Sequence, residues 1–228
     1  MENKFALIVA GGKGSRMKSE VPKQFLPLNG RPVLMHTLEA FKKYDEKLQI
    51  ILVLPESDIQ RWQQLESQFN FNLKYQIARG GKSRFQSVKN GLSFIEGDGL
   101  VAIHDGVRPM VAPHLIGASY NIAAIHHSAV AAVRLKESIR IIDKDATHAM
   151  DRSRYRLIQT PQTFRVSLIK QAYEIEEDDT LTDDASVFEK AGHSISLFEG
   201  DYRNIKITTR EDMILVEALQ KLDTEFLS

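Results

Sequence analysis

Two cations in and just after a glycine-rich loop are the residues of this sequence best suited to chemistry. The loop reads Gly11-Gly12-Lys13-Gly14-Ser15-Arg16, and Lys23 follows it. Glycines let the backbone approach a phosphate closely and point several N–H groups at it. Arg16 and Lys23 then place positive charge where a triphosphate carries negative charge. We therefore predict a site for an anionic nucleotide, with a flexible turn after a strand as the alternative.

The spacing of the glycines excludes two common phosphate-binding motifs. The dinucleotide fingerprint G-x-G-x-x-G fits Gly12 and Gly14 but meets Met17 at its last position. The Walker A motif G-x-x-x-x-G-K-[ST] fails, because neither Gly11 nor Gly12 is followed by Gly-Lys five residues on. We therefore expect neither a dinucleotide-dependent dehydrogenase nor a P-loop enzyme.

The composition is that of an ordinary soluble globular protein. The 228 residues, 43% hydrophobic and 26% charged, suit a single domain spanning residues 1–228. Basic and acidic residues number 30 each, so no global basic field indicates nucleic acid as a partner. The absence of cysteine excludes disulfides and thiolate chemistry. No apolar run is long enough for a membrane span or a signal peptide, so we expect no membrane partner and a cytoplasmic location.

Short apolar runs alternate with amphipathic stretches, which is typical of an α/β fold with a doubly wound, mostly parallel, Rossmann-like sheet. The predicted strands are residues 5–10, 49–54, 73–76, 100–104, 129–133 and 195–198. Capping patterns predict helix starts at Ser57 with Gln60, Ser83 with Gln86, and Thr209 with Asp212. A further helix begins near residue 183, capped by Thr182 or Asp183.

One region interrupts this alternation. Residues 136–165 are polar and rich in arginine, and Asp143-Lys144-Asp145-Ala146 predicts a hairpin turn between two extended pieces. A two-stranded ribbon is marginally stable alone in water, so a second subunit is its expected cover. The alternative is a mobile surface hairpin.

Further candidate residues follow the later strands. Gly80-Gly81-Lys82-Ser83 is a second glycine turn that opens a helix, where free N–H groups favour anions and hydrogen-bond acceptors. Asp105 follows a predicted strand, at the edge where open α/β sheets bind ligands, and could face a hydroxyl, a second substrate or Mg²⁺. Arg108 could bind phosphate or pair with Asp105, whereas His104 reads as a strand-end histidine with its bonds satisfied.

Lys206 is the last of these residues. It lies between Ile205 and Ile207 in a strand-like run, where a lysine loses hydration unless an anion meets it. That placement favours a functional lysine.

Taken together, these segments resemble the 2-C-methyl-D-erythritol 4-phosphate cytidylyltransferase family almost from end to end. The resemblance rests on residues 7–17 with Pro22-Lys23-Gln24-Phe25-Leu26, and on the turn at residues 80–87. It continues through His104-Asp105-Gly106-Val107-Arg108-Pro109, Met150-Asp151-Arg152 and residues 159–164. Lys82 departs from the family, in which an acidic residue is common, and this departure bears on base selectivity.

The resemblance implies nucleotidyl transfer, in which the phosphate of a polyol attacks the α-phosphorus of CTP and pyrophosphate leaves. Arg16 and Lys23 would stabilise the transition state, and Arg152 and Lys206 would position the attacking phosphate. Mg²⁺ would bridge the triphosphate oxygens, with Asp105 as a further ligand. The implied nucleotide contacts are Ala10, Gly11, Gly12, Gly14, Ser15, Gly81 and Ser87, and the implied contacts to the polyol phosphate are Asp105, Arg108, Thr160 and Thr182.

The resemblance also implies a homodimer, in which an arm at about residues 136–160 swaps across to the neighbouring active site. Two other functions stay open. A related enzyme could use ribitol 5-phosphate or a sugar 1-phosphate as acceptor, since the nucleotide half serves all of them. A protein of another class could keep the fold as a non-catalytic CTP sensor.

Overall fold

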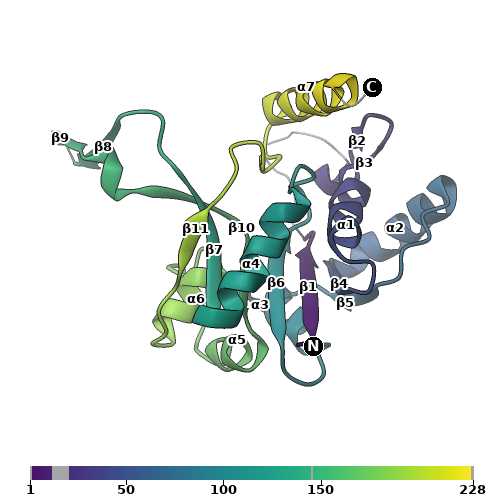
Figure 1. Cartoon of the computed structure of the whole chain (residues 1–228), viewed down its shortest axis with the longest axis horizontal. Helices are drawn as coiled ribbons and strands as arrows, with labels where there is room; N and C mark the ends of the chain where they lie inside the picture. Colours follow the sequence, from purple (N-terminus) through teal and green to yellow (C-terminus); the bar gives the residue numbers. More distant parts are fainter. Residues whose placement is uncertain (1, 12–20, 145, 227–228) are drawn as a thin grey trace.

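A seven-stranded sheet forms the centre of the protein in the computed structural model, which describes residues 2–11, 21–144 and 146–226 (Figure 1). Its order is β11-β7-β10-β6-β1-β4-β5. The strands are β1 (Lys4–Val9), β4 (Gln49–Leu54), β5 (Gln76–Arg79), β6 (Leu100–Asp105), β7 (Ser128–Arg134), β10 (Arg156–Arg165) and β11 (Leu197–Glu199). Only β10 runs antiparallel to its neighbours in this sheet, which confirms the mostly parallel fold.

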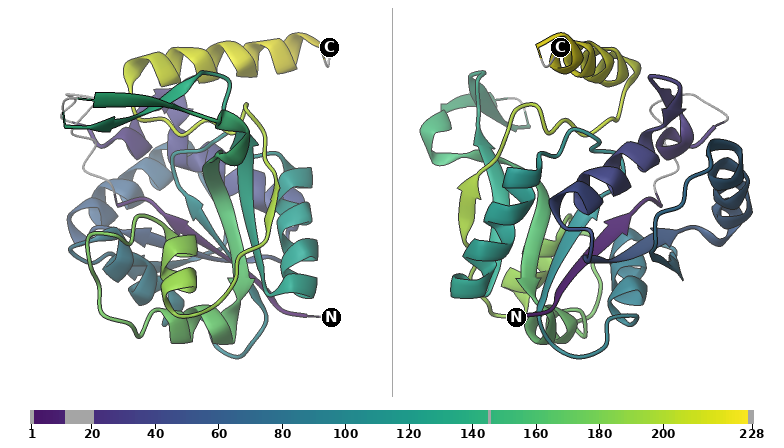
Figure 2. Two further views of the ribbon diagram at one scale, coloured as in Figure 1. Left: turned by 90° about the vertical axis from the view of Figure 1, so that its left-hand side faces the viewer. Right: turned by 45° about the vertical axis from the view of Figure 1, so that its right-hand side comes forward.

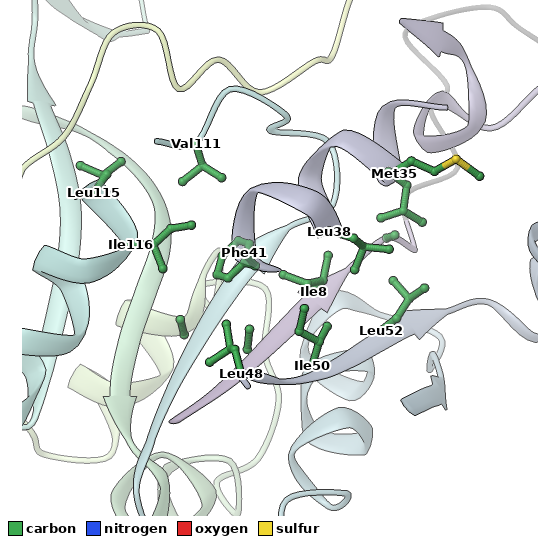
Figure 3. Close-up of a cluster of buried hydrophobic side chains, with 14 of the residues drawn as sticks. Ile8, Met35, Leu38, Phe41, Leu48, Ile50, Leu52, Val111, Leu115 and Ile116 are labelled. Atoms are coloured by element: carbon green, nitrogen blue, oxygen red, sulfur yellow. The ribbon is translucent and has the colours of Figure 1, made fainter. Parts of the chain in front are cut away.

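Helices cover both faces of the sheet, because successive side chains of each strand point to opposite sides. In β1, Ala6 and Ile8 face the cluster under α1 (Val33–Tyr44), α2 (Glu56–Phe69) and α4 (Pro113–His126). Phe5 and Leu7 face α3 (Arg84–Leu92), α5 (Val166–Ala172) and α6 (Asp184–Lys190). Figure 3 shows Leu38 and Phe41 of α1 packed over β1 and β4 in the first of these clusters.

A third, smaller cluster joins the last helix to the edge where the parallel strands end. Helix α7 (Arg210–Phe226) lies across this edge in Figure 1, near β2 (Pro27–Leu28) and β3 (Arg31–Pro32). Val216 of α7 is fully buried in this cluster. The predicted cap is confirmed, since the Thr209 hydroxyl accepts from the Asp212 N–H at 3.3 Å and Asp212 accepts from the Thr209 N–H at 2.8 Å. No helix in the described part of the chain is long and apolar enough to cross a membrane.

A two-stranded arm projects from the body of the protein (Figures 1 and 2). It consists of β8 (Ile139–Asp143) and β9 (Ala146–Met150), paired antiparallel so that Asp143 lies opposite Ala146. This pairing confirms the predicted hairpin. Ile141 and Ile142 are 51% and 76% exposed, so the arm presents apolar side chains that this chain does not cover.

The structure corrects several predicted boundaries. The strand expected at residues 73–76 begins only at Gln76. Tyr75 packs against α2 instead, where its hydroxyl accepts from the Trp62 indole N–H at 2.7 Å. The strand expected at 195–198 is Leu197–Glu199. Ser57 does not cap α2, since Pro55 precedes the helix and its carbonyl already accepts from Asp58 at 2.9 Å. Strand β10 was not predicted at all.

Candidate active site

A cavity of about 750 Å³ opens at the carboxyl ends of β1, β4, β5 and β6. This is the edge at which open α/β sheets bind ligands, and the volume is within the usual range for small-molecule sites. Its described lining comes from six segments of the sequence: Val9, Ala10 and Gly11; Pro22, Lys23 and Gln24; Pro55, Ser57 and Asp58; Gly81, Lys82, Ser83, Arg84 and Ser87; Asp105 and Val107; and Lys206.

The second glycine turn forms one wall of the cavity and is held by local hydrogen bonds. The Ser83 hydroxyl accepts from the Gln86 N–H at 3.0 Å, which confirms Ser83 as the N-cap of α3. The Ser87 hydroxyl accepts from the Gly81 N–H at 3.0 Å and donates to the Ser83 carbonyl at 2.8 Å. A Cβ on Gly81 would lie only 2.3 Å from the Cβ of Gln86, so the turn requires glycine there. These bonds fix the shape of the wall, and they occupy the Gly81 N–H, which was expected from the sequence to be free for a ligand.

Asp105 lies at the end of β6 between two cations. One of its carboxylate oxygens, Oδ2, accepts from Arg108 Nε at 3.0 Å and lies 3.1 Å from Lys206 Nζ. Burial raises the pKa of Asp105, but the charges of Arg108, Lys206 and Arg84 outweigh burial and hold it well below its usual range. The carboxylate is therefore ionised at neutral pH.

The position of Lys206 between two isoleucines predicted an anionic partner for its amine. In the structure this partner is Asp105. The residue lies in a loop rather than in the expected strand. Arg108 holds this loop in place, since its guanidinium donates to the Asn204 carbonyl at 2.8 Å as well as to Asp105. Of the two predicted roles for Arg108, pairing with Asp105 is the one present here.

Thr160 holds the backbone of Asp105 in place and also contacts His104. The Thr160 hydroxyl accepts from the Asp105 N–H at 3.1 Å and contacts His104 Nδ1 at 3.0 Å. Thr160 is 4% exposed and does not line the cavity, so in this structure it reaches the site through Asp105. Burial lowers the pKa of His104 to about 3, so its ring is neutral, as expected for a strand-end histidine with its bonds satisfied.

Lys23 also lines the cavity. It begins the short helix η2 (Lys23–Phe25) and is 9% exposed. The next residue, Gln24, anchors this helix by donating to Asp58 of α2 at 3.1 Å. The predicted contacts Gly12, Gly14, Ser15 and Arg16 lie outside the described residues.

Two predicted residues lie away from this chain's own cavity. Arg152 begins the short helix η3 (Arg152–Arg154) next to the arm, is exposed, and donates to the Lys136 carbonyl. Thr182 is also exposed, and the N-cap of α6 is Asp183, whose carboxylate accepts from the Ser186 N–H at 2.9 Å. Neither residue lines the cavity.

Arg84 was not singled out from the sequence, although it lines the cavity beside the second glycine turn. Its guanidinium donates to both carboxylate oxygens of Asp184, at 2.7 and 2.6 Å. One signal could have singled it out: a cation in the first turn of a helix opposes the helix dipole and needs an anion.

The charges of the described lining suit reactions between anions. Lys23, Lys82, Arg84 and Lys206 contribute four cations, whereas Asp58 and Asp105 contribute two carboxylates. Such a wall can bind and align two phosphate-bearing molecules that repel each other in water.

Comparison with known proteins decides the family. The 2-C-methyl-D-erythritol 4-phosphate cytidylyltransferase family matches residues 5–221. The chain belongs to this family. The cytidylyltransferase of Bacteroides thetaiotaomicron is 49% identical over 213 residues, which cover 93% of this chain and 97% of that protein. That of Phocaeicola vulgatus is 46% identical over 217 residues, covering 95% and 99%.

Solved structures of the cytidylyltransferase family share the fold. The 4-diphosphocytidyl-2C-methyl-D-erythritol synthase of Anaerococcus prevotii superposes with a TM-score of 0.81 at 30% identity. The two chains cover 96% and 99% of each other. The sequence resemblance and the nucleotidyltransferase class that it implied are therefore confirmed.

Proposed function

We propose that this protein transfers CMP from CTP to 2-C-methyl-D-erythritol 4-phosphate in the cytoplasm. The products are 4-diphosphocytidyl-2-C-methyl-D-erythritol and pyrophosphate, on the route to isoprenoid precursors. One observation carries the proposal beyond family membership: Lys23, the turn at Gly81 and Ser87, and the Asp105–Lys206 pair line one cavity although they come from distant segments.

In this proposal CTP occupies the side of the cavity formed by the two glycine segments. Gly11, Gly12, Gly14 and Ser15 provide backbone N–H groups for the triphosphate. Ala10 contributes as part of the cavity lining, since its own N–H already donates to the Val53 carbonyl at 2.9 Å. Gly81 and Ser87 hold the cytosine. Their mutual hydrogen bond at 3.0 Å supports this role, because a preorganised turn loses little entropy when it binds a base.

The attacking group is a phosphate oxygen of the polyol substrate, which is already anionic at neutral pH and needs no general base. It forms a bond to the α-phosphorus of CTP while the bond from that phosphorus to the pyrophosphate oxygen breaks. Arg16 and Lys23 stabilise the charge on the α-phosphate and on the leaving pyrophosphate. Lys206 and Arg152 position the attacking phosphate.

In the proposal, Asp105 orients Lys206 and, with Arg108, Thr160 and Thr182, provides the polyol side of the site. The short contact between Asp105 and Lys206 supports this role, because a lysine amine is otherwise free to rotate.

We propose Mg²⁺ as the metal partner of the triphosphate. No set of three or more His, Asp or Glu side chains able to hold a metal comes together within residues 2–11, 21–144 and 146–226. Asp105 already bonds two cations, which makes it a poor main ligand. The donor set thus fits a metal that phosphate oxygens and water hold, neutralising triphosphate charge. Activity should be lost in EDTA and restored by added Mg²⁺.

We further propose a homodimer in which the arm brings Arg152 to the neighbouring cavity. The exposed Ile141 and Ile142, and the absence of Arg152 from the lining of its own cavity, support this arrangement. Lys23→Ala and Arg152→Ala proteins are assayed at a low concentration of the polyol phosphate, at which the raised KM leaves the Arg152→Ala protein with little activity. Mixed and allowed to exchange subunits, they should recover activity at about one quarter of the sites, because half of the dimers are mixed and each has one intact site. If no activity is recovered although the subunits demonstrably exchange, the hypothesis of an active site shared between subunits is excluded.

The decisive test measures pyrophosphate release with each nucleoside triphosphate and each acceptor. The acceptors are 2-C-methyl-D-erythritol 4-phosphate, ribitol 5-phosphate and a sugar 1-phosphate. We expect the highest kcat/KM for CTP with the methylerythritol phosphate. A preference for ribitol 5-phosphate would reassign the substrate, whereas CTP binding without turnover would identify a sensor. Comparing CTP with UTP also shows whether Lys82 changes base selectivity.

A further inference from the structure

A buried carboxylate lies directly behind the cavity wall. Asp184, the first residue of α6, is completely buried and forms a two-point ion pair with Arg84, the first residue of α3. The hydroxyl of Tyr173 donates a third hydrogen bond to Asp184 at 2.6 Å. Asp184 is thus held from two sides, and Arg84 is held by Asp184.

The geometry leaves Arg84 able to bind a second partner. A guanidinium carries five N–H donors, and the two bonds to Asp184 use one donor each of Nη1 and Nη2. The side chain is 29% exposed, and the residue is part of the cavity lining. Donors remain for an oxygen atom of a molecule in the cavity.

The position of Arg84 identifies which part of the substrate it can reach. Arg84 follows the turn assigned to the base and lies within electrostatic range of Asp105, whose pKa it helps to lower. The part of a nucleotide next to its base is the ribose with the α-phosphate. These groups carry the oxygen acceptors that a guanidinium binds.

Without Asp184, the guanidinium of Arg84 would not keep its present orientation. Arg84 sits in the first turn of α3, where the helix dipole disfavours a cation. Arginine side chains also lose considerable rotamer entropy when fixed in one orientation. The Asp184 carboxylate offsets both effects, since its planar oxygens match the planar guanidinium.

We propose that Arg84 is a further substrate-binding residue, which donates hydrogen bonds to the ribose or α-phosphate oxygens of CTP, and that Asp184 and Tyr173 are positioning residues that aim its guanidinium. The inference rests on the proposed function, since it names contacts within the same nucleotide site. It also explains why a charged pair is buried at this place, where two well-packed apolar side chains could be as stable.

The test compares CTP affinity in three variants. Arg84→Gln removes the cation, Asp184→Asn replaces one acceptor oxygen by an NH₂ group that faces a guanidinium donor, and the double variant removes both. CTP dissociation constants are measured by calorimetry without acceptor, and KM for each substrate by pyrophosphate release. Melting temperatures, and circular dichroism below them, show whether each variant is folded.

Each single variant should weaken CTP binding by about 10- to 100-fold, as expected for loss of a charged hydrogen bond. The double variant should bind CTP no more weakly than Arg84→Gln, because Asp184 acts through Arg84. Tyr173→Phe keeps the ion pair and should cost less than either. Should Asp184→Asn not fold, Arg84→Gln decides alone, since its side chain is partly exposed and can still donate to Asp184.

Lys89→Ala is the matched control. It breaks another ion pair of α3, from Lys89 to Glu174 just after α5, at 3.1 Å, but that pair is exposed and lies outside the cavity lining. Its CTP affinity should equal that of the wild type. CTP binding by folded Arg84→Gln as tight as that of the wild type would overturn the inference while the proposed function stands. A wild type that binds no CTP would overturn both.

Discussion

Replacing Asp105 by asparagine should destabilise the protein because it leaves a cation buried without its counter-charge. Asp105 accepts from Arg108 at 3.0 Å and contacts Lys206 at 3.1 Å. The Lys206 side chain is 39% exposed, so water replaces much of its lost attraction. The Arg108 side chain is only 10% exposed. Breaking a buried pair on one side costs about 3–5 kcal/mol, so we expect a loss near the lower end, about 3 kcal/mol.

The stabilisation by Asp105 should decrease at acidic pH. The folded pKa of Asp105 lies well below its usual range, whereas an unfolded aspartate titrates near pH 4, at about 3.9. The stabilisation is therefore complete at neutral pH and is lost as the pH falls from about 4 through the folded pKa. The difference between wild type and Asp105→Asn should shrink over that range.

Urea unfolding at pH 7 and at pH 3, at one protein concentration, measures both effects. Asp143→Asn on the exposed arm is the control and should change little at either pH. A loss below about 1 kcal/mol at pH 7 would show that Arg108 is not left as a buried unpaired charge, since such a charge costs more than that. A difference that does not decrease at pH 3 would show that the ionised Asp105 carboxylate is not the source of the stabilisation.

Three further predictions follow from the site and its walls. Lys23→Ala and Arg16→Ala should each lower kcat by about 10²–10³, as removal of one electrostatic stabiliser does, and near-normal turnover would exclude both from the chemistry. Arg152→Ala should raise KM for the polyol phosphate and leave KM for CTP unchanged; an equal rise in both would contradict its assigned place. Ser83→Ala should lower the free energy of unfolding by about 1 kcal/mol, because it removes the N-cap of α3, and an unchanged urea midpoint would show that the cap contributes nothing.

Local patterns predicted the parts of the fold that depend on local interactions. The strand at residues 49–54 has the predicted bounds, and the Ser83 cap and the hairpin turn are where their sequences indicated. Strand β10 was missed because its centre is polar, yet it is buried between β6 and β7. Its polar side chains bond to distant residues: Gln162 donates to Asp183 at 2.8 Å, and Thr163 donates to Ser119 at 2.8 Å. Hydrogen-bond partners that are this far apart in the chain cannot be predicted from a single sequence.

The same limit applies to the site. The turn with Gly81 and Ser87 could be predicted, because its hydrogen bonds join residues close in sequence. Arg84 was missed because its partner, Asp184, is 100 residues away. The support that Thr160 gives to Asp105 spans 55 residues and likewise needed the structure.

The placement of the arm between β7 and β10 makes it a removable insertion. These two strands pair antiparallel up to Arg134 and Arg156, so the chain leaves and re-enters the sheet at adjacent points. A short turn could join them there without altering the order of the seven strands or the lining of the cavity. The arm can therefore change in length and sequence while the cavity keeps its geometry. If the proposed roles hold, a protein shortened in this way would still bind CTP but would no longer bind its acceptor.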